Sequence, residues 1–223
     1  MPALRILIVL VLSFLSSMAS AKQKSAEFKD GKLTDSSLGY SLQIPKNWRV
    51  KTFEEPSLIR AMLIKKNYEV NREVKDLGGD FTIPEIRLFS RPDTISPAGF
   101  VEELKRSLLS HKSEDRIINQ LELLLTGEYL SAQETEIAGN KCIQALFRRN
   151  YTRELQVDPF DPKYRQYGGL IARNEYDVHE IYVFRSGDNL FVIQAFAERE
   201  FYPGNKEEFA KILGSLTFAN AGK

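Results

Sequence analysis

From residue 129 onward, apolar and polar residues alternate with the period of a β-strand, and short glycine-containing turns divide the stretch. The segments 129–137 and 142–151, joined by a turn at 138–141, predict one hairpin. The segments 176–185 and 190–197 predict a second hairpin across Ser-Gly-Asp-Asn. Because a hairpin joins neighbouring antiparallel strands, this half of the chain is expected to form an antiparallel sheet.

Helical patterns surround these strands. Ser96 followed by proline predicts a helix start, and apolar residues then follow at helical spacing as far as Leu108. A second helix is predicted over 114–125, ended by Gly127. A closing helix has Asn205 as its expected cap. Shorter strand patterns occupy 40–44, 58–64 and 86–89. The predicted fold class is α+β, with an antiparallel β-sheet sandwiched by α-helices.

The first 21 residues have the composition of an export signal. Arg5 precedes an apolar run, and Ala19-Ser20-Ala21 satisfies the small-x-small rule for cleavage after Ala21. The run is about half of the ~20 residues needed to span a bilayer, so a retained anchor is the weaker interpretation. We therefore expect an exported protein, periplasmic or extracellular, without a stable membrane anchor.

Charge and cysteine content restrict the classes of partner. The chain has 31 basic and 30 acidic residues, and removing Arg5 leaves 30 of each. Such a balance gives no long-range field for nucleic acid or an anionic membrane. Cys142 is the single cysteine, so no intramolecular disulfide can form, and we expect it to be a small buried residue. An intermolecular disulfide through Cys142 is the alternative. We expect a monomer.

The candidates for catalysis are few. His179-Glu180 begins like a zinc-protease motif, but the position of the second histidine is Val183. We expect His111 and His179 to have surface roles, because neither has companions at metal-ligand spacing. A cysteine nucleophile would require Cys142 beside His179, which we keep as a remote alternative. No phosphate loop, nucleophile elbow or dinucleotide motif is present. The prediction is no enzyme activity, no catalytic residue, no metal and no cofactor.

The segment 158–169, DPFDPKYRQYGG, is the candidate binding region, because a long loop in a compact domain is often functional. A partner-binding surface is predicted for five of its residues: Asp158, Phe160, Asp161, Tyr164 and Tyr167. The alternative is that the Asp-Pro steps only set turns while the aromatic rings pack back on the sheet. Calcium binding by the two aspartates is disfavoured, since six or more oxygen ligands are needed.

Three segments together resemble the PsbP-like family, named for a lumenal accessory protein of photosystem II. They are GYSLQIPKNW at 39–48, ETEIAGNKCIQALF at 134–147, and NLFVIQAFAEREFYPGNKEEFAKILGSLTF at 189–218. The resemblance implies an antiparallel sheet sandwiched by helices and a non-enzymatic accessory or binding role. A Ran-binding nuclear-import factor shares that fold, so the fold by itself does not fix the partner. No photosystem role is carried over.

The predicted organisation is a signal peptide at 1–21, a short N-terminal lead at 22–35, one PsbP-like domain at 36–218 and a tail at 219–223. The predicted function is contact with an extracytoplasmic protein that the sequence does not name. Two alternatives stay open. One is a protein that binds a small molecule or a metal in a pocket between sheet and helices. The other is the Cys–His enzyme.

Overall fold

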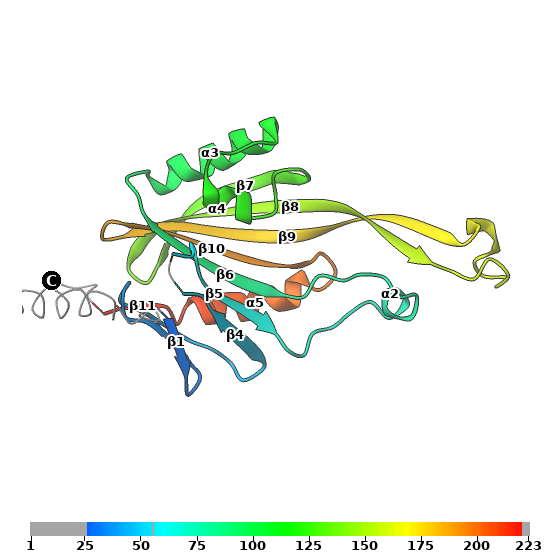
Figure 1. The fold of residues 1–223 in the computed structure, drawn as a ribbon, viewed down its shortest axis with the longest axis horizontal. Helices are drawn as coiled ribbons and strands as arrows, with labels where there is room; N and C mark the ends of the chain where they lie inside the picture. The colour runs from blue at the N-terminus through cyan, green and yellow to red at the C-terminus, as the bar shows by residue number, and fades with distance from the viewer. Residues whose placement is uncertain (1–25, 55, 220–223) are drawn as a thin grey trace, which may run out of the picture.

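The structure is a computed structural model that describes residues 26–54 and 56–219. A seven-stranded antiparallel sheet has the order β4-β5-β6-β10-β9-β8-β7. Its strands are β4 (Trp48–Thr52), β5 (Ile59–Lys65), β6 (Glu85–Pro92), β7 (Gly127–Ile137), β8 (Asn140–Gln156), β9 (Leu170–Ser186) and β10 (Asn189–Glu198). Both predicted hairpins are confirmed as β7–β8 and β9–β10. The α+β fold class is confirmed as well (Figure 1).

The position of each strand in the sheet follows from its residues. β10 lies between β6 and β9, and nearly all of its side chains are buried on both faces, so its sequence LFVIQAFA is almost continuously apolar. β7 lies at the edge of the sheet, and its polar side chains are mostly exposed. The many polar residues of β7 therefore reflect an exposed edge strand, whereas the continuous apolar residues of β10 reflect a strand that is buried on both faces.

The N-terminal strands correct the expected lead at 22–35. β1 (Ala26–Lys29) and β2 (Lys32–Asp35) pair with each other, and β2 pairs with β3 (Tyr40–Gln43). β3 also pairs with β11 (Thr217–Phe218), which completes a four-stranded sheet. The ordered fold therefore begins at Ala26. The sequence of this segment gave little sign of strands, because β1 buries only Ala26 and β2 buries only Leu33 and Asp35.

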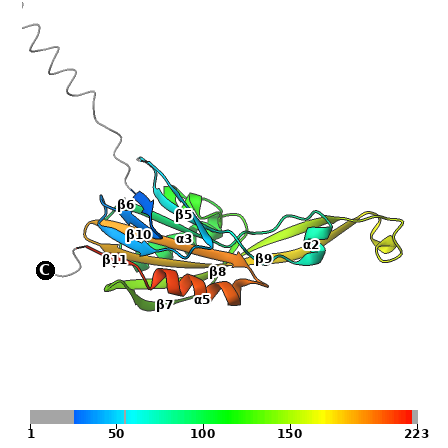
Figure 2. The same cartoon turned by 90° about the horizontal axis from the view of Figure 1, so that it is seen from below.

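Three layers of structure enclose two cores. On one face of the large sheet lie α3 (Pro97–Ser110) and α4 (Arg116–Gln120). On the other face lie the small sheet and α5 (Tyr202–Leu213), as the view from below shows (Figure 2). Trp48 and Phe209 meet edge to face in this second core, 6.0 Å between ring centroids. The sheet is therefore covered on both faces, as the sandwich prediction requires.

Two helices differ in extent from the prediction. The helix predicted over 114–125 is limited to α4, which is capped by Asp115 and followed by Glu122 with a φ of 59°. This left-handed backbone cannot continue an α-helix. α5 begins at Tyr202, so Asn205 is not its cap. Asn205 is buried in the first turn, where its amide donates to the Phe201 carbonyl (2.8 Å).

The segments expected before and around the cleavage site lie outside the described residues. This applies to the signal peptide, to cleavage after Ala21 and to most of the C-terminal tail. Within the described residues, the structure contains no helix whose length and apolar content would let it cross a membrane.

Candidate functional site

The candidate site lies on an arm formed by the far ends of β8 and β9. β7 pairs with β8 only as far as Arg149, and β10 pairs with β9 only as far as Asp177. The two long strands continue beyond these rungs and pair with each other to Gln156 and Leu170. The arm, defined as residues 150–176, extends away from the layered body with α2 (Arg72–Asp76) beside it (Figure 1).

A small third core attaches α2 to the arm. Val74 packs with Leu155, Val157 and Ile171, and all four side chains are buried. An ion pair between Glu73 and Arg173 adds to this contact, and the arginine lowers the pKa of the Glu73 carboxyl. One face of the arm is therefore covered, which gives a two-stranded ribbon the packing it lacks when isolated.

The tip of the arm is the predicted segment 158–169, which joins the end of β8 to the start of β9, and these two strands pair with each other up to Gln156 and Leu170. Asp158 and Asp161 each accept a hydrogen bond from the backbone N–H two residues on, at 2.9 and 2.8 Å. Both aspartates thus set turns, as the structural alternative proposed. A short 3₁₀ turn, η1 (Arg165–Tyr167), closes the loop.

The three aromatic side chains of the tip separate into two groups. Tyr164 is half-buried against the third core, and its hydroxyl donates to Glu73 (3.3 Å). Phe160 is 84% exposed and Tyr167 is 45% exposed, and Leu170 next to the tip is similarly exposed. The structure therefore presents Phe160 and Tyr167 to solvent and uses Tyr164 to hold the tip. Whether these residues bind a partner stays a prediction.

A charged cluster occupies the root of the arm, on the face that α3 and α4 cover elsewhere. Arg149 pairs with the fully buried Asp177, and Arg153 pairs with Glu175 and Glu198. Burial raises the pKa of Asp177, and the Arg149 guanidinium offsets part of this rise. Burial likewise raises the pKa of Glu198. Asp177, Arg153 and Glu198 are therefore buried charges that depend on their partners, whereas Arg149 and Glu175 are each about a quarter exposed.

Two connections contact this cluster, one through Thr82 and the other through Glu122. The Thr82 hydroxyl donates to Asp177 (3.1 Å), and its backbone N–H donates to Glu198 (2.6 Å). From the opposite side, the Glu122 carboxylate accepts from Arg87 (2.8 Å) and Arg149 (3.2 Å). Glu122, the residue with left-handed backbone, therefore bridges two arginines with its carboxylate.

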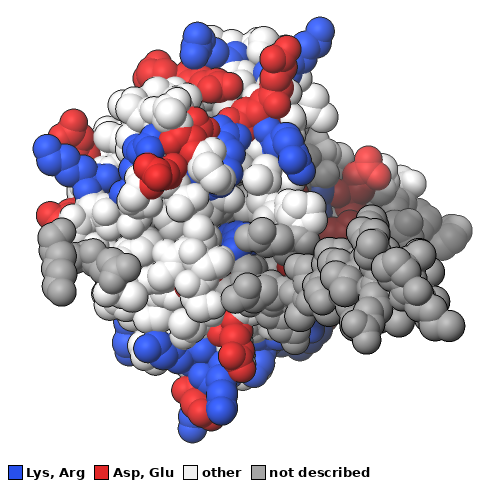
Figure 3. Space-filling model, turned by 60° about the vertical axis from the view of Figure 1, so that its left-hand side comes forward, with Lys and Arg blue, Asp and Glu red and all other residues white. Residues whose placement is uncertain are grey.

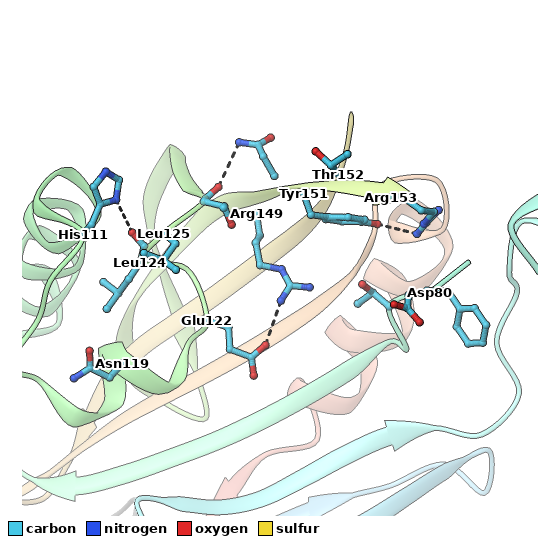
Figure 4. Close-up of a pocket in the computed structure, with 14 residues that line it drawn as sticks. Asp80, His111, Asn119, Glu122, Leu124, Leu125, Arg149, Tyr151, Thr152 and Arg153 are labelled. Atoms are coloured by element: carbon cyan, nitrogen blue, oxygen red, sulfur yellow. Dashed lines mark hydrogen bonds and ion pairs between the residues drawn. The ribbon is translucent and has the colours of Figure 1, made fainter. Parts of the chain in front are cut away.

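A groove of about 970 Å³ opens between these two loops. Figure 4 shows Arg149 reaching from β8 toward Glu122, with the Tyr151 ring beside it. Phe81 and Leu125 are exposed apolar side chains of its walls. The groove lies over β8, between the 80–82 segment and the α4–β7 connection, and not between the sheet and a packed helix. Binding of a small molecule there stays a prediction. Among the described residues, no three His, Cys, Asp or Glu side chains are grouped so as to hold a metal ion.

The structure separates the two residues of the Cys–His alternative. Cys142 is opposite Phe184 on β9, whereas His179 is opposite Phe147 on β8. Five positions along a strand correspond to about 17 Å, and an odd number of positions places the side chains on opposite faces. Burial raises the pKa of the Cys142 thiol to about 12, which disfavours the thiolate. The Cys–His pair is therefore excluded.

His179 also corrects the expected surface role of the histidines. Its ring is buried, stacks on Phe196 at 4.9 Å, and accepts a hydrogen bond from Gln194 at Nδ1 (2.9 Å). Burial holds its pKa well below the usual value, with Arg149 and Arg87 acting in the same direction. His111, by contrast, is exposed at the end of α3, where its Nδ1 donates to the Leu124 carbonyl (2.9 Å).

The surface charge agrees with the balanced composition. On the face shown in Figure 3, lysine and arginine side chains are interspersed with aspartate and glutamate, and no large area carries one sign. A face of this kind does not concentrate the potential that steers polyanions.

Sequence reasoning did not select the charged cluster. Arg149, Tyr151 and Arg153 alternate along β8, and Glu175 and Asp177 alternate along β9, so each set lies on one face. Charges of opposite sign at alternate positions of two paired strands were the available signal. Reading it required the β8–β9 register, which the predicted hairpins did not include.

The fold and the arm define an α+β protein organised around one antiparallel sheet. No family model matches the chain, and no curated protein matches its sequence. Among solved structures, the chain is similar to cyanobacterial PsbP (CyanoP) from Synechocystis sp. PCC 6803, with 10% identity and a TM-score of 0.47 over 90% of this chain and 96% of that one.

Two further structures are similar at the same level. One is LpqN, described as involved in cell envelope biogenesis of Mycobacterium tuberculosis, with 14% identity, a TM-score of 0.41 and coverage of 80% of this chain and 82% of that one. The other is the Ran-binding protein Mog1p of Saccharomyces cerevisiae, with 10% identity, a TM-score of 0.45 and coverage of 86% and 97%. Likeness at this identity concerns the fold alone.

Proposed function

We propose that this protein is an exported, non-catalytic accessory protein that binds another extracytoplasmic protein through the tip of its arm. The observation that carries the proposal is the exposure of Phe160 and Tyr167 at the end of a ribbon that projects from the body. Aromatic side chains supply much of the binding energy of protein interfaces, because each covers a large area with few rotatable bonds.

The leader pattern supports the compartment. Cleavage after Ala21 predicts a mature protein that begins at Lys22. Intact-mass measurement of the protein isolated from its native organism tests this. A mass that includes residues 1–21 would contradict export by cleavage.

Photo-crosslinking tests the contact. A benzoylphenylalanine introduced at Phe160 is expected to give one discrete light-dependent adduct in the native organism. The matched control is Leu109 on α3, which is 85% exposed and so equally open to collision, but lies on the body. Tyr167→Ser is expected to weaken the adduct formed from position 160.

The outcomes are separable. An adduct formed from position 160 and absent from position 109 supports the tip as the contact. Identical adducts from both positions, or none from position 160, would overturn it. Circular dichroism of Tyr167→Ser confirms that the variant is folded, which is expected because the ring is half-exposed and outside the third core.

A further inference from the structure

Among the strands at 26–54 and 56–219, none pairs with the outer backbone edge of β8 along the arm. The Asn150 N–H donates to the Thr126 carbonyl (3.0 Å), which is the last bond between this edge and the β7 side. On the other side, the Val157 N–H donates to the Gly169 carbonyl (3.1 Å), so odd-numbered residues bond toward β9. Because alternate residues of an antiparallel strand direct both backbone groups to one side, Thr152 and Glu154 direct theirs to the open edge.

This edge carries two charged side chains, Arg153 and Glu154, but it lacks three features that usually block strand addition, namely proline, lysine and a bulge. Residues 150–156, NYTRELQ, contain no proline and no lysine, and their register with β9 is continuous without a bulge. Proteins protect exposed edges with those features because a free edge pairs readily with another strand. An edge of this length without them is suited to accept a partner strand.

Hollows lie on both sides of the same edge. The groove of about 970 Å³ is lined on one side by Asn150, Tyr151, Thr152 and Arg153. A second hollow of about 580 Å³ includes Asn150, Tyr151 and Thr152 and continues to Tyr176 on the opposite face of the ribbon. An added strand directs alternate side chains to opposite faces, so each set would enter one hollow.

The charge of the groove selects the side chains that fit. Glu85 on β6 pairs with Arg87 beside the cluster (2.6 Å). The groove and the cluster beneath it thus hold six carboxylates against three guanidinium groups: Asp80, Glu85, Glu122, Glu175, Asp177 and Glu198 against Arg87, Arg149 and Arg153. Asp80 is exposed at the rim and has no ion pair among the described residues, and Glu122 is half-exposed. The exposed ring of Phe81 adds aromatic surface that can contact a cation, whereas the Tyr151 ring already lies against the Arg153 guanidinium (5.5 Å). The excess is therefore acidic.

We propose that the edge of β8 at residues 150–156 binds an extended segment of a partner protein, with basic and apolar side chains directed into the groove. The inference rests on the proposed function only in that both assume that this protein binds another protein. The tip and the edge are different surfaces and can fail separately.

Amide exchange measured by NMR on the full chain tests the edge. The probe is a capped eight-residue peptide in which threonine alternates with lysine and valine, and its counterpart has glutamate in place of lysine. At about ten times the Kd of the basic peptide, exchange of the Thr152 and Glu154 amides is expected to slow about tenfold. The Ala172 and Asn174 amides, on the opposite edge of the ribbon, are expected to be unchanged.

Two proline variants form a matched pair. Thr152 is directly opposite Asn174, and both direct their N–H away from the ribbon, so proline at either position breaks no bond between β8 and β9. Both variants also lose the same hydrogen bond, from the Thr152 hydroxyl to the Asn174 side chain (3.2 Å). Thr152→Pro is expected to abolish peptide binding, and Asn174→Pro is expected to retain it.

Each other outcome overturns the proposal. Equal protection by the acidic peptide contradicts the charge assignment, and protection at Ala172 and Asn174 contradicts the choice of edge. Protection without peptide that rises with protein concentration assigns the edge to a second copy. Protection independent of concentration assigns it to a segment of the same chain. No protection at millimolar peptide shows that the edge does not accept strands. Loss of the Phe160 adduct alone would leave this inference standing.

Discussion

Arg149 on β8 lies directly opposite Asp177 on β9, and 2.5 Å separates the arginine Nη2 from the aspartate Oδ2. Asp177 is fully buried, while a quarter of the arginine side chain reaches solvent. This pair stands where the layered body ends and the arm begins, because β10 stops pairing with β9 beyond the same residue. The root of the arm therefore combines a structural boundary with a buried charge.

The first prediction concerns this pair. Arg149→Met is expected to lower the free energy of unfolding by about 3–5 kcal/mol, because it leaves the Asp177 carboxylate buried without its ion-pair partner. Urea denaturation measures the effect. Adding Asp177→Asn to that variant is expected to recover part of the loss, since a neutral amide needs no cation. A single variant as stable as the wild type would show that the pair is not coupled to folding.

The second prediction is a pH dependence caused by His179. Its folded pKa is held well below its unfolded value of about 6.5, so above that pH the ring is neutral in both states. Below it, the unfolded chain binds a proton that the folded chain does not. The free energy of unfolding should therefore decrease as the pH is lowered below about 6.5, by up to about 1.4 kcal/mol per pH unit.

Comparison with His179→Phe isolates this contribution, because the carboxyls with raised pKa, Asp177 and Glu198, are shared by both proteins. Phenylalanine preserves the stack on Phe196. The free energy of unfolding of both proteins is measured in urea from pH 7.5 to 5.5. As the pH is lowered, the wild type should lose more stability than His179→Phe. Parallel curves would mean that the histidine does not titrate differently in the two states.

The third prediction concerns thiol reactivity. Cys142 is 2% exposed, and burial raises its pKa to about 12, so iodoacetamide should not modify it at pH 8 in the native protein. In denaturing urea the modification should be complete. Glu134→Cys, on the exposed edge strand β7, supplies a thiol that should react without urea. Rapid native labelling of Cys142 would contradict its buried position.

The fourth prediction compares two glycines. A Cβ at Gly127 would collide with the backbone carbonyl oxygen of Leu123, so Gly127→Ala should destabilise the fold by about 1–3 kcal/mol. Gly204, within α5, has open space around the same position. Gly204→Ala should instead stabilise by up to about 1 kcal/mol, because alanine favours the helix. Thermal unfolding of the two variants should shift in opposite directions.

The pattern of apolar residues and helix caps in the sequence predicted those strands and helices whose apolar residues follow a regular spacing. The hairpin strands, the start of α3 at Ser96 and the apolar stripe of α5 follow from periodicity and capping, which depend on neighbours in the sequence. These patterns did not predict β1 and β2, because the two strands contain few apolar residues and form only as part of the sheet that also includes β3 and β11. Nor did they predict the end of α4, which the backbone conformation at Glu122 decides.

The sequence by itself determined the alternation of strands and helices and the α+β class, because each depends on residues a few positions apart. Tertiary structure alone decided that β8 and β9 pair along their full length, that Arg149 meets Asp177, and that the edge at 150–156 is left open. The physical reason is register. Charges and backbone groups far apart in the chain come together only when strand order and strand length are fixed, and those depend on burial over the whole sheet.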